Sequence, residues 1–444
     1  MVLYDNLIIK RNEKIMMMNL FNMRRKIIKK ELYNMLMEKG SNNLDKKKII
    51  NNLVQEKQIL KKLDIENMDK FLEKADKYCN CRNMEVDTLC FMLTYQCNFK
   101  CSYCYERNMK KTLKNIGIKE VNKINNFLEW YSKKYHVKNE ILNITITGGE
   151  SLLPQNIEVI QYISKVFKKA KINIKTNGVY LTEVFERLPI DKIDSFCISL
   201  DGVENIHMSR VLEKSNSIDN HLIYSKIIKG IKLALKYKKK VYIATKIDRY
   251  TYKFIPDFIK YLENEEILQD ENCEIAINAT FDNYQPYCLD YKFNDLNDIY
   301  LISKFFKEKI PQYLDSVILL PQIGRLKSAV ERTWNKKVKY DVRVCKIENP
   351  YTMMFIPDGK IAFCDYIGSN EQVIGEFLPE IKFFEEKLLN ISCRSIYKKE
   401  ECKKCVYRMI CSTGYGKYQY IDGKQNCGIY KNEFIMDNLD VFML

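Results

Sequence analysis

The sequence predicts an α/β protein whose core is a partial, open barrel of six β-α units. Six short runs rich in Ile or Val, most of them bounded by Gly, Asn or Asp, have the composition of strands. Between them lie stretches with the apolar spacing of helices. A group of cysteines begins where the first run ends, and parallel strands place functional residues at their carboxyl ends.

The predicted strands follow one another through the middle of the 444-residue chain. They are Val86–Tyr95, Ile141–Thr147, Lys171–Thr176, Asp194–Leu200, Val241–Thr245 and Glu274–Ala279. Helical spacing is clearest in Asn156–Lys169 and Ile223–Lys238, where apolar residues recur on one face. Strands that alternate with helices favour a parallel sheet.

Three cysteines follow the first strand with the spacing C-x3-C-x2-C: Cys97, Cys101 and Cys104. A structural zinc site uses four ligands, usually as two C-x2-C pairs, and a ferredoxin-type cluster uses four thiolates. Three thiolates in one loop instead hold three irons of a 4Fe–4S cube and leave one iron open to a small molecule. A zinc knuckle or three unrelated cysteines is the plainer alternative.

With the aromatic Tyr103 before the third cysteine, this spacing resembles the radical S-adenosylmethionine (SAM) superfamily. The resemblance implies that the open iron chelates SAM and that reduction cleaves SAM to a 5′-deoxyadenosyl radical. It also implies that Gly-Gly-Glu after the second strand contacts the amino group of SAM, and that a serine and an arginine after the fourth strand reach its ribose and carboxylate. The expected SAM-binding residues are Tyr103, Gly148, Gly149, Glu150, Asn177, Ser199, Asp201 and Arg210. His207 is expected to pack or cap rather than to act in catalysis.

A second cysteine group lies near the carboxyl terminus. Cys345, Gly359 and Cys364 resemble the opening of the SPASM domain, which binds auxiliary 4Fe–4S clusters. By the same resemblance, Cys402, Cys405, Cys411 and Cys427 complete an outer cluster, whereas Tyr415 stands where a cysteine of the inner cluster is expected. The inner cluster is therefore absent, incompletely ligated or closed by Cys393. A zinc ribbon is the alternative for the whole group.

The segment before the barrel reads as a small α+β domain. Leu7–Lys10 and Lys14–Leu20 read as strands, and Arg24–Met37, Asp45–Leu63 and Glu66–Tyr78 read as helices. This order resembles the PqqD-like element that captures the leader of a precursor peptide at a sheet edge. Residues 1–50 hold twelve Lys or Arg against five Asp or Glu, a balance that suits an acidic leader. A plain packing domain is the alternative.

Composition limits the partners and the compartment. Sixteen cysteines, no apolar signal segment at the start and no long apolar run favour a cytoplasmic, non-membrane protein that uses thiols as metal ligands, in an anaerobic cell. The net charge of +16 comes mostly from lysines scattered over helical faces, without a nucleic-acid-binding motif. The expected electron donor is a flavodoxin or ferredoxin.

We therefore expect three domains: a recognition element at 1–85, a radical SAM core at 86–335 and a SPASM domain at 336–444. The resemblance implies a maturase that modifies a ribosomally made precursor peptide, by a thioether or another cross-link. Two alternatives stay open. One is an enzyme of the anaerobic sulfatase-maturating type, for which Asp365, directly after Cys364, is the candidate base. The other is a non-catalytic zinc or Fe–S module.

Overall fold

A computed structural model describes part of the chain in two units. The described residues are 6–11, 14–19, 25–31, 34, 51–52, 85–101, 103–104, 114–138, 140–211, 220–279, 296–318, 352–362, 373–387, 420–421 and 424–425. The larger unit comprises residues 83–319 and 349–389, and the other comprises residues 1–82, 320–348 and 390–444.

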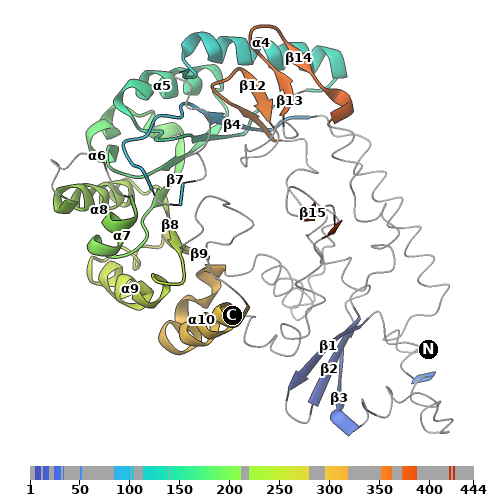
Figure 1. Ribbon diagram of the computed structural model, residues 1–444. Coiled ribbons are helices and arrows are strands. Elements are labelled where there is room, and N and C mark those ends of the chain that lie inside the picture. Colours follow the sequence, from blue (N-terminus) through green and yellow to red (C-terminus); the bar gives the residue numbers. More distant parts are fainter. Residues whose placement is uncertain are drawn as a thin grey trace. The chain divides into compact units, whose positions relative to one another are not determined.

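An eleven-stranded sheet forms the larger unit (Figure 1). Its spatial order is β10-β9-β8-β7-β6-β5-β4-β11-β12-β13-β14. The strands from β10 to β11 in this order are parallel, and β12, β13 and β14 add antiparallel to one side. The parallel strands are β4 (Thr88–Met92), β5 (Asn143–Thr147), β6 (Lys171–Thr176), β7 (Ile193–Ser199), β8 (Lys240–Ile247), β9 (Cys273–Ala279), β10 (Val317–Ile318) and β11 (Thr352–Phe355). The antiparallel ones are β12 (Lys360–Ala362), β13 (Val373–Glu376) and β14 (Lys382–Phe383).

The predicted fold class is confirmed. The six predicted strands are β4 to β9, they lie side by side in sequence order, and all are parallel. The two predicted helices correspond to α5 and α8. The alternating pattern was informative because helices cover one face of each strand with apolar contacts.

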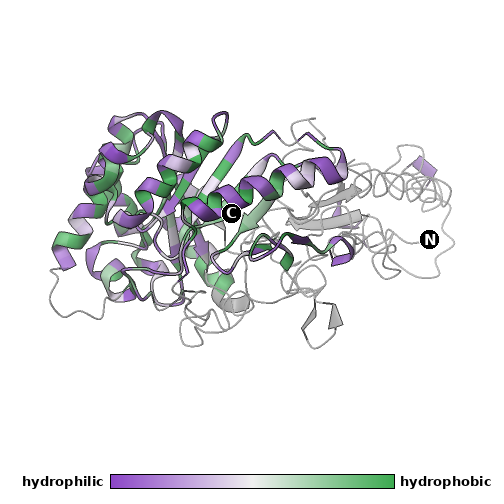
Figure 2. Cartoon of the chain, turned by 90° about the horizontal axis from the view of Figure 1, so that it is seen from above, coloured by the Kyte–Doolittle hydropathy of each residue, from purple (hydrophilic) through white to green (hydrophobic). Residues whose placement is uncertain are grey.

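Helices connect the strands and cover the convex face of the curved sheet (Figure 1). They are α4 (Ile118–Tyr135), α5 (Ile157–Val166), α6 (Leu181–Val184), α7 (Glu204–Val211), α8 (Asn220–Lys236), α9 (Ile255–Asn264) and α10 (Leu296–Lys309), with short 3-10 turns such as η5 (Tyr252–Phe254) and η8 (Pro311–Ser316). Hydrophilic and hydrophobic stretches alternate along these helices (Figure 2), as amphipathic helices require. The buried side of α8 includes Ile227 and Ile231, both fully buried.

Residues 352–383, which the sequence analysis assigned to the C-terminal domain, continue the sheet of the core. Strand β11 pairs in parallel with β4, and Met354 lies opposite Cys90. The Phe355 ring packs against Phe91 at 5.9 Å and against Phe127 of α4 at 6.0 Å between ring centroids. The aromatic contacts bury this extension in the same core.

The other unit contains a three-stranded antiparallel sheet of β1 (Asn6–Arg11), β2 (Lys14–Asn19) and β3 (Arg25–Lys29). The two predicted strands are present as β1 and β2. The predicted helix Arg24–Met37 is wrong at its start, because residues 25–29 pair with β2 and place Ile28 opposite Ile15. Consecutive β-branched residues favour a paired strand there. A two-residue hairpin of β15 (Tyr420–Ile421) and β16 (Lys424–Gln425) is also described.

The predicted helices Asp45–Leu63 and Glu66–Tyr78 lie almost wholly outside the described residues. Within the described ranges, no helix has the length and apolarity needed to cross a bilayer.

Candidate functional site

The carboxyl ends of five neighbouring strands gather the predicted site residues at one edge of the sheet. The cysteine loop follows β4, Gly148-Gly149-Glu150 follows β5, and Asn177 follows β6. Asp201 follows β7, and Asp248 follows β8. Because these strands are parallel and adjacent, the segments that follow them meet at this edge.

The thiol groups of the three loop cysteines are close enough for the charges of Cys97 and Cys104 to act on Cys101. Cys97 is exposed, whereas Cys101 and Cys104 are half-buried. Burial raises the pKa of the Cys101 thiol, and the negative charges of Asp201, Cys104 and Cys97 raise it further. Thiolates that repel one another are stabilised by a cation bound among them, so this donor set fits an iron–sulfur cluster.

Within the described part of the chain, no three His, Cys, Asp or Glu side chains are arranged so that they could bind a single metal ion. A cube does not need such convergence, because its cysteines bind different irons. Local backbone contacts shape the loop: the Cys104 N–H donates to the Cys101 carbonyl at 3.2 Å, and the Phe99 N–H donates to Cys97 Sγ at 3.4 Å.

The two glycines after β5 allow that segment to lie against the segment after β4. The Gly149 N–H donates to the Thr94 carbonyl at 2.7 Å, and the Glu150 N–H donates to the Gln96 carbonyl at 2.8 Å. Gly148 has a φ of +134°, and a Cβ there would lie 2.5 Å from the Thr94 carbonyl oxygen. A Cβ on Gly149 would overlap the Gln96 carbonyl. The close approach is thus to the backbone that begins the cysteine loop.

Glu150 is buried and joins the segment after β5 to the carboxyl end of β6. Its carboxylate accepts hydrogen bonds from the Leu152 N–H at 2.8 Å, the Thr176 hydroxyl at 2.5 Å and the Asn177 N–H at 2.8 Å. Burial raises its pKa although these hydrogen bonds lower it. A carboxylate has about four lone-pair sites, so one acceptor position is left for an ammonium group. The predicted contact with the amino group of SAM stays a prediction.

Asn177 links β6 to the cysteine loop. Its side-chain amide donates to Asn98 Oδ1 at 2.8 Å and lies 3.9 Å from Cys97 Sγ. Its own Oδ1 accepts from the Val179 N–H at 3.1 Å. Asn98 was not among the predicted site residues, although it directly follows a predicted cluster cysteine.

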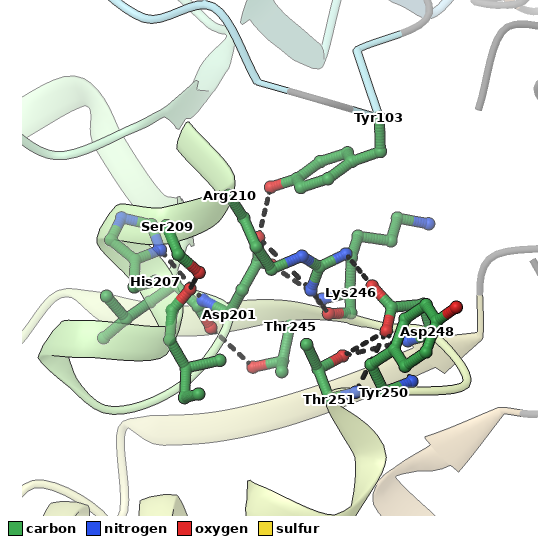
Figure 3. Close-up of polar contacts among 12 residues, drawn as sticks. Tyr103, Asp201, His207, Ser209, Arg210, Thr245, Lys246, Asp248, Tyr250 and Thr251 are labelled. Carbon is green, nitrogen blue, oxygen red and sulfur yellow. Dashed lines mark hydrogen bonds and ion pairs between the residues drawn. The ribbon is translucent and has the colours of Figure 1, made fainter. Parts of the chain in front are cut away.

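Arg210 lies at the centre of a buried polar cluster (Figure 3). Its guanidinium lies 3.6 Å from Asp201 Oδ2 and 3.2 Å from Asp248 Oδ2, and only 4% of its side chain is exposed. It also donates to the Lys246 carbonyl. The Tyr103 ring stacks on it with 4.6 Å between the guanidinium carbon and the ring centroid.

Tyr103 attaches the cysteine loop to this cluster. Its hydroxyl donates to Asp201 Oδ2, as Figure 3 shows. Burial, with the charge of Asp201 next, raises the pKa of Tyr103 well above its ordinary value, so the hydroxyl stays protonated and donates. Three of the predicted residues, Tyr103, Asp201 and Arg210, are therefore in mutual contact.

Residues 91–262 match the Radical SAM superfamily. This part of the chain is a radical SAM domain. It contains the cysteine loop and all the residues described above as its neighbours at the carboxyl edge. The match supports a 4Fe–4S cluster and SAM as the cofactors of this part of the chain.

Three curated relatives show how far the likeness extends. A GTP 3′,8-cyclase of Clostridium perfringens is 27% identical over 53% of this chain and 65% of its own length. A cysteine-type anaerobic sulfatase-maturating enzyme of Clostridium novyi is 22% identical over 72% of this chain and 84% of its own length. The antilisterial bacteriocin subtilosin biosynthesis protein AlbA of Bacillus subtilis is 33% identical, over 26% of this chain and 24% of its own length. The chain thus spans just under two thirds of the cyclase and a quarter of AlbA.

Two solved structures share the fold. The structure of anSMEcpe with bound AdoMet superposes with a TM-score of 0.55 at 17% identity, over 80% of this chain and 96% of the other. The structure of Streptococcus suis SuiB bound to precursor peptide SuiA gives a TM-score of 0.50 at 14% identity, over 94% and 95% of the two chains. At these identities the likeness concerns the fold alone.

Sequence reasoning missed Asp248 in the radical SAM domain. Its Oδ1 accepts from the Tyr250 N–H at 2.9 Å and the Thr251 N–H at 3.0 Å, which shapes the turn into η5, while Oδ2 faces Arg210. The sequence signal that could have identified Asp248 is its position directly after a strand, which it shares with Asp201. It was overlooked because the strand was expected to end at Thr245, whereas β8 continues to Ile247.

His207 is packed, as expected. Its ring is fully buried, and its Nδ1 accepts from the Asp201 N–H at 3.2 Å. Burial lowers the pKa of His207 to about 4, so the ring is neutral. It lies edge-on to Phe99 of the cysteine loop, with 6.4 Å between ring centroids.

Ser199 ends β7 and is half-buried. The other predicted site residues lie outside the described residues: Asp365 as candidate base, the cysteines Cys345, Cys364, Cys393, Cys402, Cys405, Cys411 and Cys427, and Tyr415. Their roles stay predictions.

Proposed function

We propose that this radical SAM enzyme modifies a ribosomally synthesised precursor peptide, forming a thioether or another cross-link. The observation that carries the proposal is the cysteine loop at the carboxyl edge, which is held there by a hydrogen bond from Asn177 to Asn98 and by one from Tyr103 to Asp201. AlbA, which by its name serves bacteriocin biosynthesis, and SuiB, solved with a precursor peptide, support a peptide substrate.

Each residue at the edge has a part in this activity. Cys97, Cys101 and Cys104 hold the cluster, whose chemistry with SAM supplies a carbon radical that abstracts a hydrogen atom. Glu150 is placed to accept from the SAM ammonium group, with Gly148 and Gly149 bringing it close to the loop. Ser199, Asp201 and Arg210 complete the SAM site by family resemblance. The sheet orients the peptide and keeps water from the reacting carbon.

The two segments outside the radical SAM domain serve the same proposal. Residues 1–85 capture an acidic leader by strand addition to the sheet of β1, β2 and β3. Residues 336–444 carry one or two auxiliary 4Fe–4S clusters that take up an electron or bind a peptide thiolate, and a flavodoxin or ferredoxin supplies reducing electrons.

Co-expression tests this proposal. The full chain is produced anaerobically with each short peptide encoded beside its gene, and the peptides are analysed by mass spectrometry. We expect one peptide to lose a hydrogen pair, as cross-linking requires, and to stay unmodified with the Cys97→Ala, Cys101→Ala, Cys104→Ala triple variant. A chain lacking residues 1–83 should modify that peptide poorly. Absence of any modified peptide, with SAM cleavage intact, contradicts the proposal.

A second candidate is a maturase of a protein side chain. It is favoured by the sulfatase-maturating relative, which this chain covers over 84% of its length, and by Asp365 directly after Cys364. A synthetic sulfatase-type peptide with a central cysteine distinguishes the two, because conversion of that cysteine to an aldehyde is not a cross-link. Aldehyde formation, absent in Asp365→Asn, would favour this second function.

A further inference from the structure

The first cysteine of the loop is held through both of its chain neighbours. Gln96, before Cys97, accepts a hydrogen bond from the Glu150 N–H at 2.8 Å, and Asn98, after it, accepts one from the Asn177 side-chain amide at 2.8 Å. Glu150 and Asn177 are themselves joined, because the Glu150 carboxylate accepts from the Asn177 N–H at 2.8 Å. The segments after β5 and β6 therefore close a ring of hydrogen bonds around Cys97.

The turn after β6 determines the orientation of the Asn177 amide. Its Oδ1 accepts from the Val179 N–H at 3.1 Å, so the oxygen faces the turn and the Nδ2 group faces the cysteine loop. One N–H of Nδ2 is used by Asn98, and Nδ2 lies 3.9 Å from Cys97 Sγ. The second N–H of Nδ2 is therefore the donor directed at that sulfur.

Cys97 Sγ thus faces two N–H donors. The Phe99 N–H lies within the same loop, with 3.4 Å between its nitrogen and the sulfur, and the Asn177 amide approaches from the carboxyl end of β6. A thiolate that binds a metal can only accept hydrogen bonds, so both donors suit the sulfur in its cluster-bound form. The Phe99 donor is a backbone group that any residue but proline provides, whereas the Asn177 donor depends on this side chain.

Hydrogen bonds to its sulfurs change how readily an iron–sulfur cluster accepts an electron. Reduction adds negative charge to the cluster and to the thiolates that hold it. An N–H group directed at one of these thiolates stabilises the more negative, reduced state, and so raises the reduction potential.

We propose that Asn177 is a positioning residue that tunes the cluster held by Cys97, Cys101 and Cys104. Its amide donates an N–H···S hydrogen bond to the Cys97 thiolate and thereby raises the reduction potential of that cluster. This assigns the Asn177 amide to the cluster, whereas the family resemblance assigned the residue to SAM. The inference rests on the iron–sulfur part of the proposed function and not on its peptide substrate.

A redox titration of the full-length, reconstituted chain without SAM tests the inference. The reduced cluster is followed by electron paramagnetic resonance, and the spectra of the Cys97→Ala, Cys101→Ala, Cys104→Ala variant are subtracted to remove signals from elsewhere in the chain. Asn177→Asp keeps an oxygen for the Val179 N–H but replaces the donor by a negative charge. A unit charge about 4 Å from the sulfur changes the equilibrium constant for reduction by about fivefold even in water. With the hydrogen bond also lost, we expect a fall of about tenfold, which is about 59 mV for a one-electron couple.

Three further variants separate the hydrogen bond from charge and from loop position. Asn177→Ala removes the donor without adding a charge, and should lower the constant by about threefold. Asn173→Asp adds the same charge to β6 about 13 Å earlier along the strand, where an aspartate can still accept from the Ser195 hydroxyl, and should lower it much less. Asn98→Ala breaks the contact between Asn177 and the loop and removes an oxygen 4.0 Å from Cys97 Sγ, but keeps the donor, so it should not lower the constant.

Three results would overturn the tuning role. They are an unchanged potential in Asn177→Ala, a fall in Asn98→Ala or Asn173→Asp as large as that in Asn177→Asp, and loss of iron from both Asn177 variants. The last would make Asn177 a structural support of the loop. If the Asn177→Ala potential is unchanged and SAM binding is weaker in equilibrium dialysis, the amide serves SAM instead. An unmutated chain that binds no cluster through the three cysteines contradicts the proposed function itself, whereas a bound cluster with an unchanged potential contradicts only the tuning.

Discussion

Arg210 shows how one side chain connects the cysteine loop to the rest of the domain. It stacks on Tyr103 from the loop, pairs with Asp201 after β7 and with Asp248 after β8. A cation buried between two carboxylates is stable only while both partners are present, because an unpaired buried charge is costly. The position of Tyr103, and with it that of the neighbouring Cys104, depends on these two carboxylates.

Asp248→Asn tests this dependence at the residue scale. Asparagine retains the Oδ1 that shapes the turn after β8 but removes the charge that faces Arg210. We expect the free energy of unfolding to fall by about 3 kcal/mol and the iron content after reconstitution to fall with it. Asp257→Asn, an exposed change on α9, is the matched control. Full iron content and unchanged stability in Asp248→Asn would show that Arg210 does not need this partner.

His207 predicts a specific pH dependence of stability. Its pKa falls from 6.5 to about 4 on folding, so the unfolded chain binds the proton more readily. The neutral, buried His207 ring therefore contributes to the free energy of unfolding fully above pH 6.5. This contribution, roughly 3 kcal/mol, is lost as the pH falls toward 4. Unfolding measured between pH 7 and 4 should show this loss, and His207→Gln should lose less stability over the same range. Parallel pH profiles of the two proteins would contradict the buried neutral ring.

At the scale of elements, the strands β4 to β9 could be predicted because each is a short run rich in apolar, mostly Ile or Val, residues, most of them bounded by Gly, Asn or Asp. Two features were not readable. A short run such as that of β3 satisfies both helical and strand spacing, and its pairing with β2 decides it. The residues that hold the loop from a distance, Asp248 above all, depend on where a strand ends, which propensity does not determine.

The contact between the segments after β4 and β5 is the element-scale feature most sensitive to mutation. Gly149→Ala would place a methyl group on the Gln96 carbonyl and push the two segments apart. We expect the free energy of unfolding to fall by about 1–3 kcal/mol and the iron content after reconstitution to fall with it. In Gly117→Ala the only described contact of the new methyl group is with the Glu120 side chain, at 3.1 Å, so this control should cost less than Gly149→Ala although Gly117 caps α4. Equal effects of the two changes would mean that the close approach is not required.

For the whole molecule, the radical SAM core was predicted by sequence more completely than the segments around it. The reason is physical: a parallel sheet imposes a repeated pattern on its strands, whereas a domain held together by metal clusters is specified by a few cysteines. Counting those cysteines predicts one complete auxiliary cluster, from Cys402, Cys405, Cys411 and Cys427, and an inner cluster short of a ligand at Tyr415.

Iron analysis of the Cys97→Ala, Cys101→Ala, Cys104→Ala variant tests that count. About four irons per chain indicate one auxiliary cluster and about eight indicate two, because each is a four-iron cube. Where eight are found, we expect Cys393→Ala to leave the count unchanged if the inner cluster has an open iron. Loss of four irons on that change would show that Cys393 closes the cluster.

The central claim is that the three-cysteine loop at the carboxyl edge of the sheet makes this protein a SAM-cleaving enzyme. The most direct measurement is 5′-deoxyadenosine formation by the reconstituted full chain with SAM and a strong reductant. We predict that the unmutated chain forms it and that the Cys97→Ala, Cys101→Ala, Cys104→Ala variant does not, while the variant keeps its C-terminal iron. Formation of 5′-deoxyadenosine at an undiminished rate by the triple variant would contradict the claim.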